Sequence, residues 1–455
     1  MNDITPTENA PKFDPEAAHM NQPKLRPVRG FPFQHEGETL LGLADAQQIS
    51  DRILYTAPAA QMILPHLNGE KDLDTILGEV GKGLTREMLE TFVCQLDQAG
   101  LLEGPVFDEL LASVRADYES SDLLPPGASE MFTKMAINKS LDRDLGEDVT
   151  DEELTEHAQE SVAKQFDTWI DEALKDAQDP SFDELPHAII APHIDYPRGW
   201  QSYASVYGRL RVVDRPDRVI ILGTNHFGRG TGVVGCDKGY ETPLGACPLD
   251  KEALETLRNE LGDANSDRLL ENRYDHEREH SIECQLMWLQ HAFGANEQGE
   301  HIKVLGVLVH DPTVNNGESY DGNGLAFEPF AAALKRTIES LPGRTLVIAS
   351  ADLSHVGPQH GDPKPLAGDD KEIAQARNRV VAHDREMLGH VGKGAADELI
   401  SAMAWMQNPT RWCSIGCLGA MLKVVDADEI KMIQYTASMD PNGLSMVTSC
   451  AAAFF

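Results

Sequence analysis

The chain has little of what marks a secreted or membrane-spanning protein. Its seven cysteines among 455 residues are few and odd in number. They do not suit a disulfide framework, so a reducing compartment is expected. The N-terminus lacks the basic start and apolar core of a signal peptide, and no segment offers the roughly 18 apolar residues of a membrane span. We therefore expect a cytoplasmic protein without a membrane partner.

Basic residues are scarce as well. The chain has 39 Lys plus Arg against 74 Asp plus Glu, a formal net charge of −35. Such a charge repels polyanions, so no nucleic-acid partner is expected. The sequence also contains neither a Walker loop nor a GxSxG nucleophile elbow. A hydrophobic content of 41% is sufficient for an ordinary core, and the length predicts two or three structural units.

Changes in composition along the chain predict four segments. They are a polar, proline-bearing segment over residues 1–30, a small helical module over 31–104, an acidic helical connector over 105–184, and a main domain over 185–455. The first segment is predicted to be disordered or draped over the surface. The last part of the connector carries Trp169, Ile170 and Leu174 at helical spacing, and we expect it to pack on the main domain.

The module of residues 31–104 has three predicted helices, over Ala59–Leu67, Asp72–Val80 and Thr85–Ala99. It resembles a winged-helix module of the PqqD-like peptide-recognition type, which implies a peptide or protein partner. The module has four basic and twelve acidic residues, so it lacks the basic surface that DNA binding requires. We favour a structural cap on the main domain, with partner docking as the alternative.

From residue 185 onward, short β-branched runs alternate with longer amphipathic segments. The runs predict strands over Ala188–Ala191, Val219–Leu222, Gly232–Val234, Ile302–Val309, Leu346–Ala349, Ile430–Ala437 and Leu444–Ala452. The segments predict helices over Trp200–Leu210, Lys251–Leu261, Ser281–Phe293, Pro329–Ser340, Lys371–Leu388 and Ala395–Met406. This alternation predicts an α/β domain with a mixed, largely parallel sheet and helices on both faces.

Three of the predicted strands lead into turns that carry a histidine: His193, His226 and His355. Loops at the carboxyl ends of strands form the ligand crevice of an open α/β sheet, so we expect the imidazoles to share one crevice. Cys413, at a predicted loop-to-helix junction, adds a thiol. Such donors suit a transition metal. The alternatives are a hydrogen-bonded loop histidine at His193 and a small buried hydrophobe at Cys413.

Acidic residues accompany these histidines. Asp352, three residues before His355, could orient an imidazole, bind a metal or act as a base. The segment Asp275–His280 contains HExxH, the zinc-protease string, but the segment is charged throughout. We interpret it as a loop and the first turn of a helix, with Glu279 and His280 either lining the crevice as acid-base groups or decorating the surface.

Five short motifs occur in a fixed order: Ala191–Tyr196 (APHIDY), Leu222–His226 (LGTNH), Tyr240–Gly245 (YETPLG), Glu279–Glu283 (EHSIE) and Ser350–Gly357 (SADLSHVG). Together they resemble the Memo-like family, whose bacterial and archaeal members are called AmmeMemoRadiSam system protein B. The resemblance covers the chain from His187 to its end and leaves out the module of residues 31–104.

This resemblance implies a fold similar to class III extradiol (LigB-type) dioxygenases, which hold nonheme iron with two histidines and a carboxylate. Memo-like proteins have a crevice of histidines and a cysteine that is implicated in iron or copper binding and oxidative chemistry. Carried over to this chain, the implied metal ligands are His193, His226, His355 and Cys413. The implied cofactor is iron(II) or copper, ahead of zinc.

Two positions depart from the family pattern. The Ala-Gly-Tyr that usually follows the first histidine is here Ile194-Asp195-Tyr196, which adds a carboxylate beside the expected metal position. The glycine that usually follows the cysteine is here Ser414.

Two hypotheses about function follow. The first is an O₂-dependent, dioxygenase-like oxidoreductase acting on a small molecule or peptide, in which Asp352, Glu279 and His280 tune the ligands or move protons. The second is a binding or adaptor protein whose crevice holds a metal or peptide without turnover. A cysteine among the ligands favours the second, because a thiolate beside iron or copper in air is itself easily oxidised.

Overall fold

The computed structural model of the chain describes residues 13–81, 83–368 and 370–455. It divides into two compact units, Met1–Ser121 and Asp122–Phe455. The division lies inside the acidic segment of residues 105–184. Among the described residues, none of the helices has both the length and the apolar composition needed to cross a bilayer.

The smaller unit combines a three-stranded antiparallel sheet with short helices. The strands, in the order β1-β2-β3, are β1 (Val28–His35), β2 (Glu38–Asp45) and β3 (Leu54–Thr56). The helical elements are α1 (Ala18–Asn21), η1 (Pro58–Met62), η2 (Leu64–His66), α2 (Leu73–Val80), α3 (Arg86–Gln98) and α4 (Pro105–Glu119). The sequence analysis did not identify the strands, and the winged-helix resemblance of this unit stays a prediction.

Two of the three helices predicted in this unit are confirmed. Helices α2 and α3 begin directly after Asp72 and Thr85, whose side chains accept hydrogen bonds from backbone N–H groups of the first helical turn. The predicted helix over Ala59–Leu67 is instead the pair of 3₁₀ turns η1 and η2. Pro65 explains the interruption, because proline has no N–H to continue a helix.

Part of the segment predicted to be disordered is built into the smaller unit. Residues 1–12 lie outside the described residues. Arg26 is buried, and its Nη1 donates to the Asp45 carboxylate at 3.0 Å and to the carbonyl oxygen of Gly100 at 2.6 Å. Strand β1 begins two residues later. The predicted disorder is therefore wrong for residues 26–30, because a buried ion pair anchors a segment whose composition is polar.

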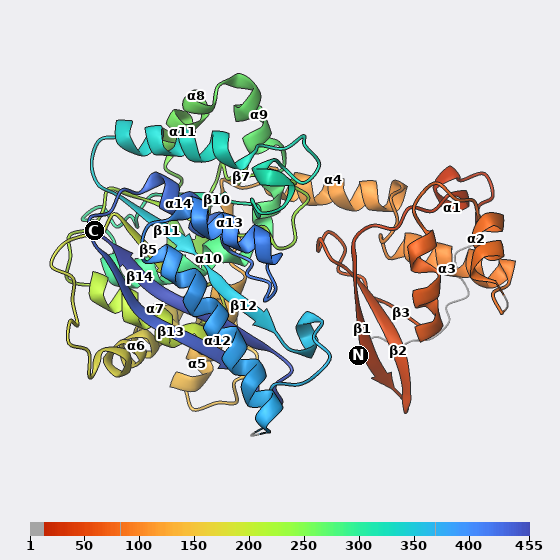
Figure 1. Ribbon diagram of the computed structural model, residues 1–455, viewed down its shortest axis with the longest axis horizontal. Helices are drawn as coiled ribbons and strands as arrows, with labels where there is room; N and C mark the ends of the chain where they lie inside the picture. Colours follow the sequence, from red (N-terminus) through yellow and green to blue (C-terminus); the bar gives the residue numbers. More distant parts are fainter. Residues whose placement is uncertain (1–12, 82, 369) are drawn as a thin grey trace. The chain divides into compact units, whose positions relative to one another are not determined.

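The larger unit is organised around an eight-stranded mixed sheet (Figure 1). Its strands are β5 (Ala188–Ala191), β6 (Arg218–Gly223), β7 (Val234–Gly235), β10 (Val304–Leu308), β11 (Thr345–Ser350), β12 (Asp352–Val356), β13 (Ile430–Met439) and β14 (Met446–Phe454). Seven follow the order β12-β14-β5-β11-β6-β10-β7, and β13 pairs with β14. The central pairs β5·β11, β11·β6 and β6·β10 are parallel. The predicted fold class is confirmed.

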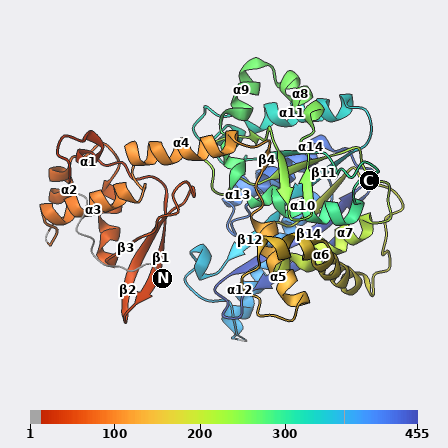
Figure 2. The same cartoon turned by 180° about the vertical axis from the view of Figure 1, so that it is seen from behind.

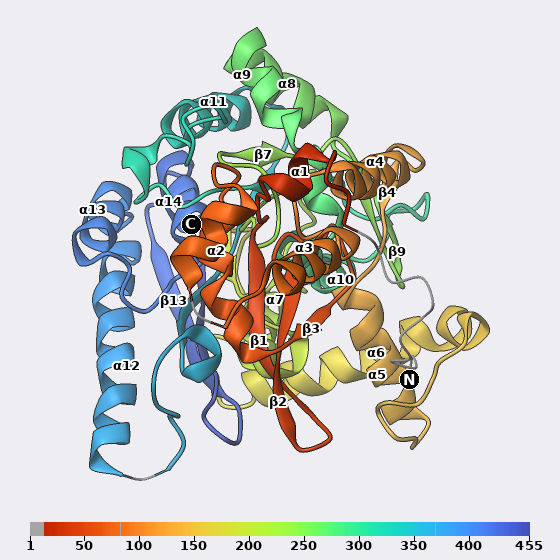
Figure 3. The same cartoon turned by 90° about the vertical axis from the view of Figure 1, so that its right-hand side faces the viewer.

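Helices cover both faces of this sheet. They are α5 (Ala128–Ser140), α6 (Asp151–Leu174), α7 (Tyr196–Leu210), α8 (Lys251–Leu261), α9 (Asp263–Glu271), α10 (His280–Phe293), α11 (Phe327–Ser340), α12 (Lys371–Val391), α13 (Ala396–Met406) and α14 (Ile415–Val424). Figure 2 shows α5, α6, α7 and α10 together on one face. On the other, Ile190 and Leu222 share a buried core with Phe330 of α11 and Leu418 of α14. Helix α12 runs along one side and is followed by α13 (Figure 3).

Smaller elements complete the unit. They are a three-stranded sheet of β4 (Leu123–Leu124), β8 (Gly239–Thr242) and β9 (Gly245–Cys247), and the 3₁₀ turns η3 (Arg273–Glu277), η4 (Asn315–Gly317) and η5 (Pro358–His360).

The end of the acidic segment packs on α7 and α10. The ring of Phe166 in α6 stacks on buried Trp288 of α10, with ring centroids 3.7 Å apart and planes 4° from parallel. A Cβ atom added at Gly208 of α7 would lie only 2.8 Å from Cγ2 of Ile170 in α6. A glycine at that position therefore allows the two helices to approach closely.

Truncating Phe166 tests this packing. Phe166→Ala should lower the free energy of unfolding by about 3 to 5 kcal/mol, because it removes a buried ring from a packed aromatic cluster. Met131→Ala on α5, where the side chain is 69% exposed, is the control and should change it by less than about 0.5 kcal/mol. Urea denaturation followed by circular dichroism measures both. Equal effects of the two substitutions would contradict this packing.

Candidate metal centre

Three neighbouring parallel strands bring the predicted site residues to one edge of the sheet. In the register of β5, β11 and β6, Ala191 pairs with Ser350, and Ala349 pairs with Leu222. The strands therefore end side by side. His193 and His226 lie in the loops that leave β5 and β6, and Asp352 begins β12 directly after β11. Side chains that follow parallel strands share the crevice at the carboxyl edge of the sheet.

Three of the four predicted ligands converge. The ligand atoms of His193, His226 and Cys413 lie within 4.8 Å of one another. Cys413 Sγ lies 3.3 Å from Nε2 of His193, whose side chain is buried. The rings of His193 and His226 meet edge to face, with centroids 5.0 Å apart. We call His193, His226 and Cys413 the His-Cys cluster.

A second group of donors shares His226. It consists of His226, Glu279 and His280. Oε1 of the buried Glu279 lies 3.0 Å from Nδ1 of His226 and 3.2 Å from Nδ1 of His280. Glu279 also caps α10, where its side chain accepts a hydrogen bond from the Ser281 N–H. One carboxylate therefore holds two imidazoles, and both Glu279 and His280 lie at the crevice.

The Nδ1 atoms of His193, His226, His280 and His355 each lie next to an oxygen. His193 Nδ1 lies 3.0 Å from the carbonyl oxygen of Ser350. His355 Nδ1 lies 3.0 Å from the carbonyl oxygen of Leu353. Nδ1 of His226 and of His280 faces Glu279. A metal-binding histidine commonly donates its second ring N–H to such an oxygen. Each of these rings is therefore oriented to offer Nε2 as a ligand atom.

His355 stands apart from the cluster. Among the described residues it belongs to neither group of donor atoms. Its ring lies edge to face with His360, with centroids 5.3 Å apart. His280, expected to serve in acid-base chemistry, lies closer to the other histidines, with ring centroids 5.7 Å from His193 and 4.9 Å from His226. The assignment of His355 as a ligand stays a prediction.

The two departures from the family pattern lie in different places. The carboxylate of Asp195 caps α7, where it accepts from Arg198 N at 3.1 Å and pairs with the Arg198 side chain. The carboxylate expected beside the metal position is therefore engaged at a helix end. Ser414 is at the cluster itself, with its Oγ 3.2 Å from Cys413 Sγ.

Burial determines the protonation of the cluster. It lowers the pKa of His193 well below the ordinary value, and the nearby imidazoles of His226 and His280 lower it further. Burial also raises the pKa of the Cys413 thiol well above its usual range, with Asp352 adding to the shift. Without a cation, His193 is therefore a neutral imidazole beside the protonated thiol of Cys413. A bound metal would displace that thiol proton.

The carboxylates respond to the same surroundings in opposite ways. Burial alone would raise the pKa of Glu279, but His226 and His280 outweigh it and hold this pKa well below its usual range. Burial raises the pKa of Asp352, against the opposing effect of His355. Asp352 Oδ1 accepts a hydrogen bond from His193 N at 3.1 Å, and its Oδ2 lies 3.7 Å from His193 Nε2. Asp352 therefore lies at the cluster.

Polar side chains from distant elements hold the loops in place. Asp275 accepts hydrogen bonds from Asn225 Nδ2 at 2.7 Å and from Gly230 N at 2.7 Å, which fixes the loop around His226. Gln285 of α10 donates to the carbonyl oxygen of Pro192, directly before His193, at 2.6 Å. The sequence analysis assigned neither role.

Asp384 of α12 holds two further segments of the site. It accepts hydrogen bonds from four side chains: Ser354 Oγ at 2.5 Å, Trp412 Nε1 at 2.8 Å, Tyr435 Oη at 2.7 Å and Thr448 Oγ1 at 2.6 Å. Ser354 directly precedes His355, and Trp412 directly precedes Cys413. Asp384 lies among Val380, Met387 and Val391 on the buried face of α12, so a charged residue on an apolar stripe was the signal in the sequence.

The HExxH string has a structural role at its first histidine. His276 lies in η3, whereas His280 is the first residue of α10, so the two are not on one helix. The ring of His276 is buried between the Tyr240 hydroxyl, 3.1 Å from Nδ1, and the Val234 carbonyl oxygen, 3.1 Å from Nε2. The interpretation of this segment as a loop and first helical turn is confirmed.

The buried His276 should make stability depend on pH. Burial lowers its pKa from 6.5 to about 4, so between these values the unfolded chain binds a proton that the folded chain does not. The free energy of unfolding therefore decreases as pH falls, and His276 accounts for about 2 kcal/mol of this decrease at pH 5. His276→Gln should show a smaller drop in Tm between pH 7 and pH 5 than the unsubstituted chain. Equal drops in calorimetry would contradict this role.

Known proteins with similar sequences support the family resemblance. The family model of Memo-like proteins matches residues 155–453. A MEMO1 family protein of Methanopyrus kandleri is 28% identical over 272 residues, 59% of this chain and 82% of that protein. One of Thermotoga maritima is 31% identical over 275 residues, 59% of this chain and 83% of that protein. One of Thermotoga neapolitana is 34% identical over 221 residues, 46% of this chain and 69% of that protein.

Proposed function

Because the chain belongs to the Memo-like family, we propose that it binds a redox-active iron or copper ion at the His-Cys cluster and catalyses an O₂-dependent oxidation. The observation that carries the proposal is that the ligand atoms of His193, His226 and Cys413 lie within 4.8 Å of one another, while Nδ1 of each imidazole faces an oxygen. His280 and His355 are the candidates for a further ligand position.

The chemistry of the donor set fits such an ion. Imidazole nitrogen suits iron, copper and zinc, and thiolate sulfur is a soft donor that copper(I), zinc and iron accept. When bound, iron or copper would supply redox chemistry with O₂ as the oxidant. Zinc fits the same donors but has no redox chemistry, so it would support binding alone.

The chain's own residues would orient the site and hold protons. Burial alone would lower the pKa of His280, but its bond to Glu279 outweighs burial and raises that pKa above the ordinary value. His280 is also partly exposed, with a side-chain exposure of 33%, so it can exchange its proton with solvent. In this role Glu279 positions His280 and His226, and Asp352 holds the main chain at His193.

A second candidate is a protein that holds a metal or peptide in the same crevice without turnover. Cys413 favours it, because a thiolate beside iron or copper in air is easily oxidised. Metal analysis of the purified chain, joined to oxygen uptake with a panel of small molecules and short peptides, distinguishes the two. Bound iron or copper with substrate-dependent uptake supports the enzyme, and tight copper without uptake supports the binder.

Ligand substitutions test the metal site itself. Cys413→Ala and His226→Ala should each reduce metal affinity by more than the roughly 10- to 100-fold that loss of an outer partner costs, with the fold intact. Cys417→Ala is the matched control: Cys417 is buried one helical turn further on, where its Sγ lies 3.5 Å from Thr224 Oγ1. Its metal content, measured by mass spectrometry, should be unchanged. Full metal content in Cys413→Ala and His226→Ala would overturn the proposed ligands.

Asp384 should act as a positioning residue for this site. Asp384→Asn keeps the size of the side chain but replaces one accepting oxygen with a donor, which disturbs the segments before His355 and Cys413. We expect metal affinity to fall about 10- to 100-fold and the electron paramagnetic resonance spectrum of the copper-loaded chain to change. Asp397→Asn, at a 79% exposed side chain of α13, is the control. Unaltered affinity and spectrum in Asp384→Asn would argue against positioning.

A further inference from the structure

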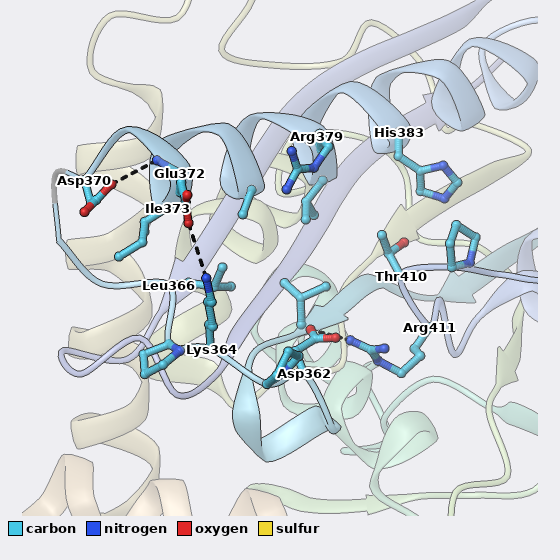
Figure 4. A pocket seen from close by; sticks show the side chains of 16 residues that line it. Asp362, Lys364, Leu366, Asp370, Glu372, Ile373, Arg379, His383, Thr410 and Arg411 are labelled. Atoms are coloured by element: carbon cyan, nitrogen blue, oxygen red, sulfur yellow. Dashed lines mark hydrogen bonds and ion pairs between the residues drawn. The ribbon is translucent and has the colours of Figure 1, made fainter.

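A cavity outside the His-Cys cluster lies between helix α12 and the loop that follows β12. Its volume is about 610 Å³, within the usual range for small-molecule sites. None of His193, His226, His355 and Cys413 lines it. In Figure 4 the side chains of α12 face those of the loop and of Arg411 across the cavity.

One part of the cavity wall is apolar. Val356 of β12, Leu366 of the loop and Val380 of α12 are buried together in a small hydrophobic cluster, with Ala376 packed against it. All four line the cavity. A ligand that fills this space therefore needs an apolar body.

Four of the six charged residues that line the cavity form ion pairs with each other. Arg411 Nη2 lies 2.6 Å from Asp362 Oδ2, and Lys364 Nζ lies 3.3 Å from Glu372 Oε2. Arg379 has no ion-pair partner within the part of the chain that the structure describes. Arg379 is exposed on α12, so its guanidinium is available to a ligand in the cavity.

His383 adds a second unused polar group. It lines the cavity on the same helix as Arg379, and its Nε2 has no hydrogen-bond partner among the described residues although the atom is buried. Because this atom is closed off from solvent, a ligand in the cavity could bond to it only after the His383 side chain turns toward the cavity.

We propose that this cavity binds a small organic monocarboxylate, with the carboxylate at Arg379 and the apolar body against Val356, Leu366 and Val380. A guanidinium matches a carboxylate through two parallel N–H donors. Asp362, Asp370 and Glu372 also line the cavity and would repel a dianion, so a carboxylate is favoured over a phosphate monoester. This proposal does not depend on a metal at the His-Cys cluster.

A substitution at Arg379 tests this cavity without disturbing the candidate metal centre. Arg411 also lines the cavity, but its Nε donates to the carbonyl oxygen of His355 at 2.9 Å. A substitution at Arg411 would therefore disturb both sites. Arg385 provides a matched control for Arg379, because it is exposed on the same helix and does not line the cavity.

Titration calorimetry of the full chain with sodium octanoate tests the proposal. We expect one saturable site, weakened about tenfold or more in Arg379→Gln, because a charge-assisted hydrogen bond contributes more than a neutral one. Binding should be unchanged in Arg385→Gln. A bulkier side chain in Ala376→Phe should occupy the apolar space and also abolish binding.

Two further probes test the ligand class. Octanol has the same apolar body without a charge, and octyl phosphate carries a second charge; both should bind more weakly than octanoate. No octanoate binding, unaltered binding in Arg379→Gln, or tighter binding of octanol or octyl phosphate would each overturn the assignment. Circular dichroism verifies that each variant is folded.

Discussion

The parallel pairing of β5, β11 and β6 is the constraint on which the rest of the site depends. Because Ala191 pairs with Ser350 and Leu222 pairs with Ala349, the chain leaves all three strands at one edge of the sheet. Residues far apart in the sequence, such as His193 and His226, then need only short loops to meet. Cys413 joins them from the segment before α14, which packs on the same strands. The sheet therefore provides rigid support, and the loops provide the chemistry.

Carboxylate side chains hold in place the segments that carry the site residues. Glu279 and Asp384 lie in the interior and Asp275 is half-buried, so an isolated charge at these positions would be costly. Each accepts hydrogen bonds from segments that carry site residues. Glu279 differs from the other two because it contacts imidazoles directly. The donors that satisfy these carboxylates are the same groups that would orient a metal site. Loss of one carboxylate would release a loop and leave polar groups unpaired.

Much of this arrangement could be predicted from the sequence, and the exceptions have physical reasons. The apolar runs identified the central strands, and the polar turns after them identified His193 and His226. Strand β12 was not recognised, because Asp352 and His355 interrupt its hydrophobic pattern. The position of His355 relative to the cluster depends on that strand. Asp384 was overlooked although it interrupts the apolar stripe of α12. Its partners lie on β12, β13, β14 and the loop before α14, and such long-range contacts cannot be identified from the sequence.

The central claim is that His193, His226 and Cys413 hold one ion. X-ray absorption at the metal edge of the iron- or copper-loaded chain tests it most directly, because it identifies the atoms bound to the metal. The account predicts a shell that contains imidazole nitrogen and one sulfur, with the sulfur absent in Cys413→Ala. A shell of oxygen and nitrogen alone in the unsubstituted chain, prepared without oxygen, would contradict it.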